Sequence, residues 1–167
     1  MLFRSCSHAG IDMQHTFRID GVTGRFTAVL GTDGELFVGT VVNDLEPLLN
    51  SQLLETKIEV LKNAGLIITD TNMNPDCIQW LIQFCSDNSI PCIIEPVSIP
   101  KAKKLAEMDL SNLFLVTPNE VELSSIQSIA SEPGLKGMIN ALLARGVQHV
   151  WLRQGENGST IYDKASH

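Results

Sequence analysis

The sequence lacks the features of a membrane, secreted or nucleic-acid-binding protein. No apolar run approaches the roughly 18 residues of a membrane-spanning helix, and residues 1–10 contain no long apolar stretch of the kind found in a secretory signal. Basic residues are not in excess either, because the formal net charge is −7. We therefore expect no general affinity for nucleic acids or for anionic membranes.

Paired cysteine motifs are also absent. The four cysteines, Cys6, Cys77, Cys85 and Cys92, show no C-x-x-C spacing, which argues against a zinc site. They lie in or beside expected helices and strands, so reduced thiols are favoured over disulfides. This pattern indicates an intracellular protein, first of all a cytoplasmic one, and a mitochondrial leader stays open if Met1 is not the native start.

Apolar sequence, by contrast, is sufficient for one folded domain, since 44% of the 167 residues are hydrophobic. From residue 65 onward, short apolar runs alternate with amphipathic segments, a rhythm typical of an α/β fold with a mostly parallel sheet. Strands are expected at 66–70, 92–95, 113–116, 149–153 and, antiparallel to the last of these, 159–162. Helices are expected at 51–64, from Asn74 and Pro75 through Cys85, at 101–108 and at 134–145.

A β-hairpin is predicted at 26–42, before this α/β region. Two β-rich runs, 26–30 and 35–42, flank an Asp-Gly turn, the strongest short-range hairpin signal. The apolar side chains of such a hairpin need either a core or a partner.

The most informative stretch is 117–122, T-P-N-E-V-E, directly after the expected strand 113–116. Thr117 is predicted to be the N-cap of a helix, with Pro118 at its first position and Glu120 completing a capping box. Folding then leaves Asn119 and Glu122 without a structural role. They share one helical face beyond the carboxyl end of a strand, where open α/β sheets bind ligands.

Several segments in register resemble the PfkB carbohydrate kinase family, also called ribokinase-like. The stretch 117–122 resembles the family's Asn-x-x-Glu motif, Gly155-x-x-Gly158 resembles its glycine turn near the nucleotide, and the hairpin resembles the lid over its sugar site. Within the family, the likeness is greatest to pseudouridine kinases. The segments that carry it are 9–12 (A-G-I-D), 23–30 (T-G-R-F-T-A-V-L), 70–72 (D-T-N) and 95–102 (E-P-V-S-I-P-K-A).

The resemblance implies a three-layer αβα fold and a nucleotide site that uses ATP with Mg²⁺. Asn119 and Glu122 would organise Mg²⁺ and its waters, the alternative being that both are solvated first-turn residues. Gly155 and Gly158 would let the backbone approach ATP, although a plain hairpin turn explains these glycines equally well.

Three further polar residues are candidates for contacts to the substrate or to a phosphate. Asp70 and Asn72 follow the expected strand 66–70, but an Asx turn accounts for them almost as well. Lys101 follows a proline-fixed loop and is a candidate cofactor-binding residue, whereas most lysines at helix starts are simply solvated.

The sequence departs from the family pattern at three points. Arg153 stands where the family usually has a threonine close to the nucleotide. Counterparts of the N-terminal glycine-rich segment and of the C-terminal G-A-G-D motif, which supplies the general base and the anion hole, are not found in the 167 residues. We therefore expect an incomplete kinase domain that does not catalyse on its own.

The expected function is thus part of an ATP-dependent kinase that phosphorylates pseudouridine at its 5′-hydroxyl. Two alternatives stay open. One is a ribokinase-like or adenosine-kinase-like enzyme with another acceptor. The other is a non-catalytic truncated form that associates through the hairpin, for example as a homodimer.

Overall fold

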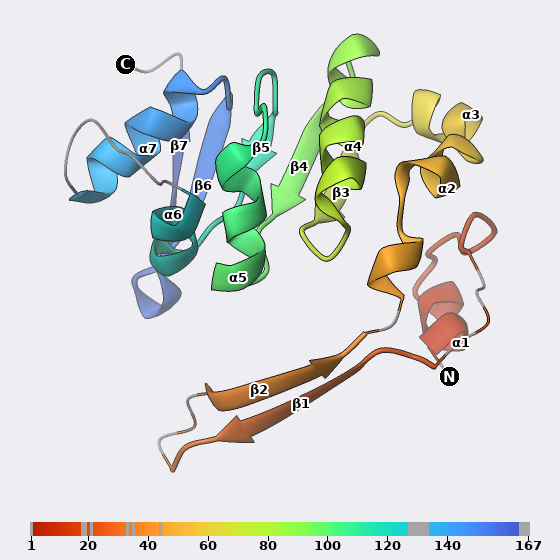
Figure 1. Cartoon of the computed structure of the whole chain (residues 1–167), viewed down its shortest axis with the longest axis horizontal. Coiled ribbons are helices and arrows are strands. Elements are labelled where there is room, and N and C mark those ends of the chain that lie inside the picture. The colour runs from red at the N-terminus through yellow and green to blue at the C-terminus, as the bar shows by residue number, and fades with distance from the viewer. Residues whose placement is uncertain are drawn as a thin grey trace. The chain divides into compact units, whose positions relative to one another are not determined.

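The structure is a computed structural model that describes residues 2–17, 20, 22–32, 34, 36–43, 45–126 and 134–163. It divides into two compact units, residues 1–45 and residues 46–167. Figure 1 shows the helices and strands of each unit.

The first unit contains a helix, α1 (Leu2–His8), and a hairpin of two antiparallel strands, β1 (Arg25–Leu30) and β2 (Leu36–Val42). The hairpin predicted at 26–42 is therefore confirmed. Its turn is closed by the amide of Gly34, which donates to the carbonyl of Gly31 at 3.0 Å. Gly34 has a φ of +84°, a conformation that glycine adopts without steric cost. Asp33 lies outside the described residues.

The second unit is built on a five-stranded sheet in the order β3-β4-β5-β6-β7. Strands β3 to β6 are parallel, and β7 runs antiparallel to β6, which confirms the predicted mostly parallel α/β sheet. The strand bounds are β3 (Ile67–Asp70), β4 (Cys92–Glu95), β5 (Leu115–Val116), β6 (His149–Arg153) and β7 (Ser159–Asp163). Because the four parallel strands point the same way, their carboxyl ends lie along one edge of the sheet.

The helices of this unit pack along the sheet (Figure 1). The α-helices are α2 (Ser51–Glu55), α3 (Ile58–Lys62), α4 (Pro75–Asp87), α5 (Ile99–Ala102), α6 (Glu120–Ile126) and α7 (Gly134–Ala144). Short 3-10 helices are found at η1 (Glu46–Leu48), η2 (Lys103–Glu107) and η3 (Gly155–Asn157). Among the described residues, no helix is both long and apolar enough to cross a bilayer.

Helix α4 begins as predicted. The side chain of Asn74 accepts a hydrogen bond from the amide of Cys77 at 2.9 Å, and Pro75 occupies the first turn. This N-cap satisfies a backbone donor that has no partner inside the helix.

Two helix predictions need correction. The single helix expected at 51–64 is broken into α2 and α3, because the Thr56 hydroxyl donates to the Leu53 carbonyl at 2.7 Å and the Lys57 amide closes a tight turn onto Leu54. The helix expected at 101–108 begins earlier, at Ile99, and continues as a 3-10 helix from Lys103.

The core lies between the sheet and its helices. Alternate strand residues point into it, so Ile94, Val116, Val150 and Leu152 are fully buried. On the opposite face of the sheet, the side chain of Ile68 is exposed.

We predict that Ile94→Ala lowers the free energy of unfolding by about 2–5 kcal/mol, because it removes a buried side chain and leaves a cavity. Ile94→Val should cost only about 0.5–1.5 kcal/mol. Urea denaturation measures both, with Ile68→Ala as the control, since Ile68 is 69% exposed on the same sheet. Equal losses for Ile94→Ala and Ile68→Ala would contradict this placement of the core.

Candidate functional site

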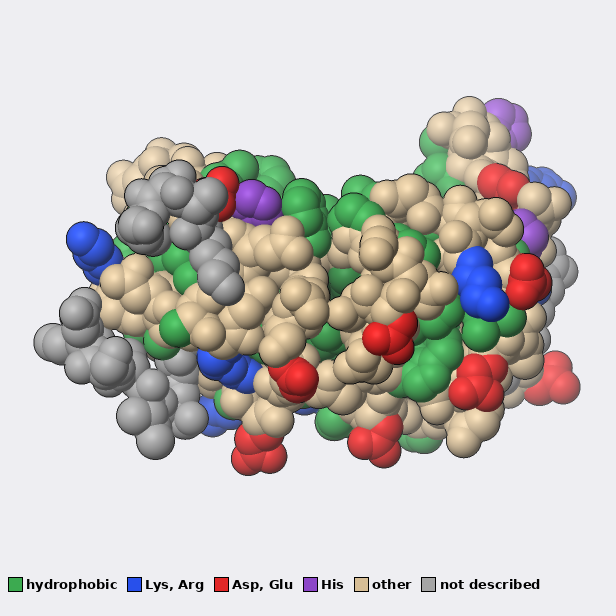
Figure 2. Space-filling view, turned by 90° about the horizontal axis from the view of Figure 1, so that it is seen from above, with side chains coloured by type: hydrophobic (Ala, Val, Ile, Leu, Met, Phe, Trp, Pro, Cys, Tyr) green, Lys and Arg blue, Asp and Glu red, His purple; other side chains and the backbone are tan. Residues whose placement is uncertain are grey.

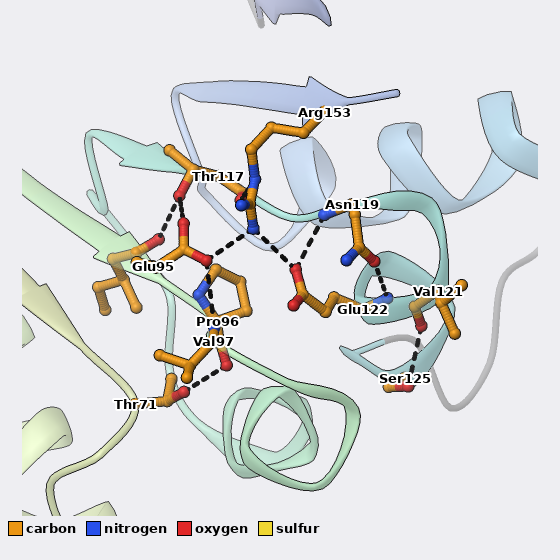
Figure 3. Close-up of polar contacts among 11 residues, drawn as sticks. Thr71, Glu95, Pro96, Val97, Thr117, Asn119, Val121, Glu122, Ser125 and Arg153 are labelled. Atoms are coloured by element: carbon orange, nitrogen blue, oxygen red, sulfur yellow. Dashed lines mark hydrogen bonds and ion pairs between the residues drawn. The ribbon is translucent and has the colours of Figure 1, made fainter. Parts of the chain in front are cut away.

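Polar side chains gather where strands β4, β5 and β6 end (Figure 3). Glu95 is the last residue of β4, Thr117 follows β5, and Arg153 is the last residue of β6. Helix α6 begins just beyond, so Asn119 and Glu122 lie in the same group. This is the carboxyl edge at which a ligand site was expected.

Asn119 and Glu122 form a reciprocal capping box at the start of α6. The Asn119 Oδ1 atom accepts a hydrogen bond from the Glu122 amide at 2.8 Å, and Glu122 Oε2 accepts one from the Asn119 amide at 2.9 Å. The prediction that Thr117 and Glu120 form this box was therefore wrong. So was the inference that folding leaves Asn119 and Glu122 without a role.

The helix starts two residues later than predicted because strand pairing continues past β5. The Arg153 amide donates to the Pro118 carbonyl at 2.9 Å, and Asn119 forms a parallel bridge with Arg153. Thr117 and Pro118 are therefore held as an extension of the sheet. The Thr117 hydroxyl donates instead to Glu95 Oε2.

Arg153 joins this group through three side-chain hydrogen bonds. Its Nε donates to the Thr117 carbonyl at 2.8 Å, while Nη2 donates to Glu95 Oε1 at 2.6 Å and to Glu122 Oε2 at 3.0 Å. The Glu122 side chain is only 5% exposed, whereas that of Arg153 is 43% exposed. Arg153 therefore compensates the charge of a nearly buried carboxylate although its own side chain is partly exposed.

One carboxylate oxygen of Glu122 has no hydrogen-bond partner in the part of the chain that the structure describes. Both of its hydrogen bonds go to Oε2, and no partner for Oε1 is found among the described residues. A buried acceptor without a partner is costly unless a water or an ion binds it.

This arrangement fits Mg²⁺ better than a metal enclosed by protein ligands. No group of three or more His, Cys, Asp or Glu side chains that could hold a metal occurs in the described part of the chain. Mg²⁺ commonly uses one or two carboxylates together with waters and phosphate oxygens. One free oxygen of Glu122, next to Glu95, is consistent with that mode of binding.

Asp70, Asn72 and Lys101 come together at the carboxyl end of β3. Asp70 Oδ1 accepts from the Asn72 amide at 2.9 Å, which is the Asx turn considered as the alternative, and Asp70 Oδ2 accepts from Asn72 Nδ2 at 2.6 Å. Lys101 Nζ in turn donates to Asn72 Oδ1. Asn72 therefore links Asp70 to Lys101, and Lys101 is not simply solvated, as most lysines at helix starts are.

Gly155 and Gly158 shape the turn between β6 and β7. Their φ angles are +57° and +83°, and the Gln154 amide donates to the Gly158 carbonyl at 2.8 Å. A Cβ at either glycine would meet no atom within 4 Å. Backbone conformation, and not crowding, therefore accounts for both glycines in the turn.

Glu95 is the residue of this group that sequence reasoning missed. A signal was present, because Glu95 ends an apolar strand just as Asp70 does. Arg153 had been noted only as a departure from the family pattern, and its contacts with two carboxylates were not anticipated.

The family model for pfkB family carbohydrate kinases matches residues 1–167. The chain belongs to the pfkB family of carbohydrate kinases. This confirms the resemblance drawn from the sequence.

Two curated relatives of this kinase family are similar over most of the chain. The uncharacterized sugar kinase YeiI of Escherichia coli K12 is 26% identical over 155 residues, which are 91% of this chain and 42% of that protein. The pseudouridine kinase of Arabidopsis thaliana is 26% identical over 147 residues, which are 87% of this chain and 35% of that protein. The chain thus spans less than half the length of either relative.

Solved structures show the same ribokinase-like fold. A carbohydrate kinase from Agrobacterium tumefaciens superposes with a TM-score of 0.79 at 20% identity, covering 98% of this chain and 52% of that one. A candidate ribokinase II from E. coli, solved with ATP and Mg²⁺, has a TM-score of 0.60 at 15% identity, covering 77% and 45% of the two chains.

We predict that Asn119→Ala lowers the free energy of unfolding by about 0.5–2 kcal/mol, because it removes the cap of α6. Asn119→Ser should retain most of the stability, since serine also accepts a hydrogen bond from the helix amides. Thermal and urea unfolding measure the difference. Equal stability of the alanine and serine variants would show that the capping box contributes nothing.

Proposed function

We propose that this chain is part of an ATP-dependent kinase that phosphorylates pseudouridine at its 5′-hydroxyl. The observation that carries the proposal is the nearly buried Glu122 carboxylate beside Arg153 at the carboxyl edge of the sheet, whose Oε1 atom has no partner among the described residues. A carboxylate and a guanidinium at this edge suit the positioning and charge neutralisation that phosphoryl transfer requires. The pseudouridine kinase relative supports the choice of acceptor.

The roles of the individual residues follow from their contacts. Glu122 would offer Oε1 to Mg²⁺, which neutralises phosphate charge when bound, and Asn119 would hold the Glu122 side chain in position through the capping box. Gly155 and Gly158 would let the backbone of the turn approach ATP closely, because neither residue carries a side chain.

The group at the end of β3 is assigned to the phosphate or the acceptor. Lys101 brings a positive charge, which would attract a phosphate. Asp70 and Asn72 bring hydrogen-bonding groups that suit the hydroxyls of a nucleoside. Asn72 links the other two residues, so the three would act as one unit.

No residue of the 167 is assigned as the general base. General base catalysis raises the rate of such reactions by about 10²- to 10⁴-fold. We therefore propose that the 167-residue chain on its own binds nucleotide but does not turn it over. The activity is assigned to the protein of which they form a part.

A second candidate function is association through the hairpin. The exposed fractions are 61% for Phe26, 59% for Leu30 and 82% for Phe37. Such exposed apolar strands favour a partner surface, and a second copy of the chain would supply one. Sedimentation that shows only monomer at high concentration would rule out this dimer.

We predict that ATP binds the chain in a Mg²⁺-dependent manner and that Glu122→Gln weakens this binding at least about tenfold, as expected when a metal ligand is lost. Calorimetric titration with and without Mg²⁺ measures the effect. Glu59→Gln is the matched control, because the Glu59 side chain is 81% exposed on α3. If the two variants bind alike, Glu122 does not hold the metal.

For the acceptor, we predict turnover with pseudouridine in preference to uridine, adenosine and ribose in the whole gene product, and none in the 167 residues alone. A coupled assay for ADP release measures both proteins. Preference for ribose or adenosine would show that the proposed acceptor is wrong. Turnover by the 167 residues alone would contradict the proposal that they do not catalyse.

A further inference from the structure

The guanidinium of Arg153 is fixed along one edge only. Nε and Nη2 are both used, by the Thr117 carbonyl, Glu95 Oε1 and Glu122 Oε2. Arginine carries five N–H donors in a planar fork. For the two donors on Nη1, no acceptor is found among the described residues (Figure 3).

The Arg153 side chain is partly accessible to solvent. The Arg153 side chain is 43% exposed although its partner Glu122 is 5% exposed. The protein therefore anchors one edge of the guanidinium at the ends of the parallel strands, while part of the Arg153 side chain stays exposed.

The charge around the guanidinium also matters for an anionic ligand. Two carboxylates, Glu95 and Glu122, would repel a phosphate if they stood alone. Arg153 offsets part of their charge and adds donors in the geometry that suits phosphate oxygens. On the face drawn in Figure 2, the basic side chains of the described residues lie scattered among other types.

We infer that Arg153 is a phosphate-binding residue, whose Nη1 donates to a phosphate oxygen of the nucleotide while Thr117, Glu95 and Glu122 hold the guanidinium plane. The inference rests on the proposed function and deepens it. A threonine at this position, as the family resemblance implies for other members, would offer one hydroxyl in place of a charged fork. Glu95 is then a positioning residue for Arg153.

The test titrates ATP and inorganic tripolyphosphate into the chain, each with and without Mg²⁺. Arg153→Gln should weaken binding of both ligands by about ten- to a hundredfold, as expected for loss of a hydrogen bond from a charged donor. Arg153→Lys should bind with intermediate affinity, because lysine keeps the charge without the anchored fork. Lys62→Gln, which removes one positive charge from α3, should bind as the wild type does; the Lys62 side chain is 48% exposed.

A second measurement needs no substitution. Phenylglyoxal modifies accessible guanidinium groups, and mass spectrometry reports the modified fraction of Arg153. Tripolyphosphate should protect Arg153 severalfold and leave the exposed Arg25 unprotected. An arginine that only holds Glu95, Glu122 and Thr117 together, without binding phosphate, would show no such protection.

The outcomes separate the two proposals. If ATP binds with Mg²⁺ but Arg153→Gln binds equally well, or if Arg153 is modified equally with and without ligand, the inference is wrong and the proposed function stands. If the wild-type chain binds neither ATP nor tripolyphosphate, both fail. If Arg153→Gln does not fold, protection in the wild type decides.

Discussion

Parallel pairing of four strands is the constraint on which the candidate site depends. It places the ends of β3, β4, β5 and β6 along one edge, so that residues far apart in the sequence become neighbours. Glu95 and Arg153 meet across this edge at 2.6 Å. No local motif brings them together, and the site exists only because the sheet does.

At that edge, the nearly buried carboxylate of Glu122 is the group whose charge must be compensated if the fold is to be stable. An ionised group in such a position must be paired, and removing a single partner of a buried pair is strongly destabilising. Arg153 and the Asn119 amide supply the pairing. The same contacts that stabilise the start of α6 therefore fix the orientation of the group proposed to bind Mg²⁺, so the Asn-x-x-Glu motif combines a structural role with the proposed metal-binding role.

The sequence is sufficient to predict the parts of the fold that depend on local patterns. The hairpin, the parallel strands and the Asn74 cap of α4 follow from side-chain periodicity and turn chemistry. The sequence is not sufficient where contacts between distant residues override the local preference for a helix or a strand. Thr117 and Pro118 resemble a helix start, but the hydrogen bond from the Arg153 amide to the Pro118 carbonyl and the bridge between Asn119 and Arg153 delay the helix to Glu120. Asp70 and Glu122 were recognised as candidates, whereas the role of Glu95 depends on a neighbour 58 residues away in the sequence.

The most direct measurement of the central claim is to locate the metal-nucleotide complex by NMR, with Mn²⁺ in place of Mg²⁺ and ATP present. The paramagnetic ion broadens amide signals of nearby residues. The account predicts selective broadening at Asn119 to Glu122 and at Arg153, lost in Glu122→Gln. Broadening confined to another part of the chain, or none at saturating ATP, would contradict the assignment of the nucleotide site to this edge of the sheet.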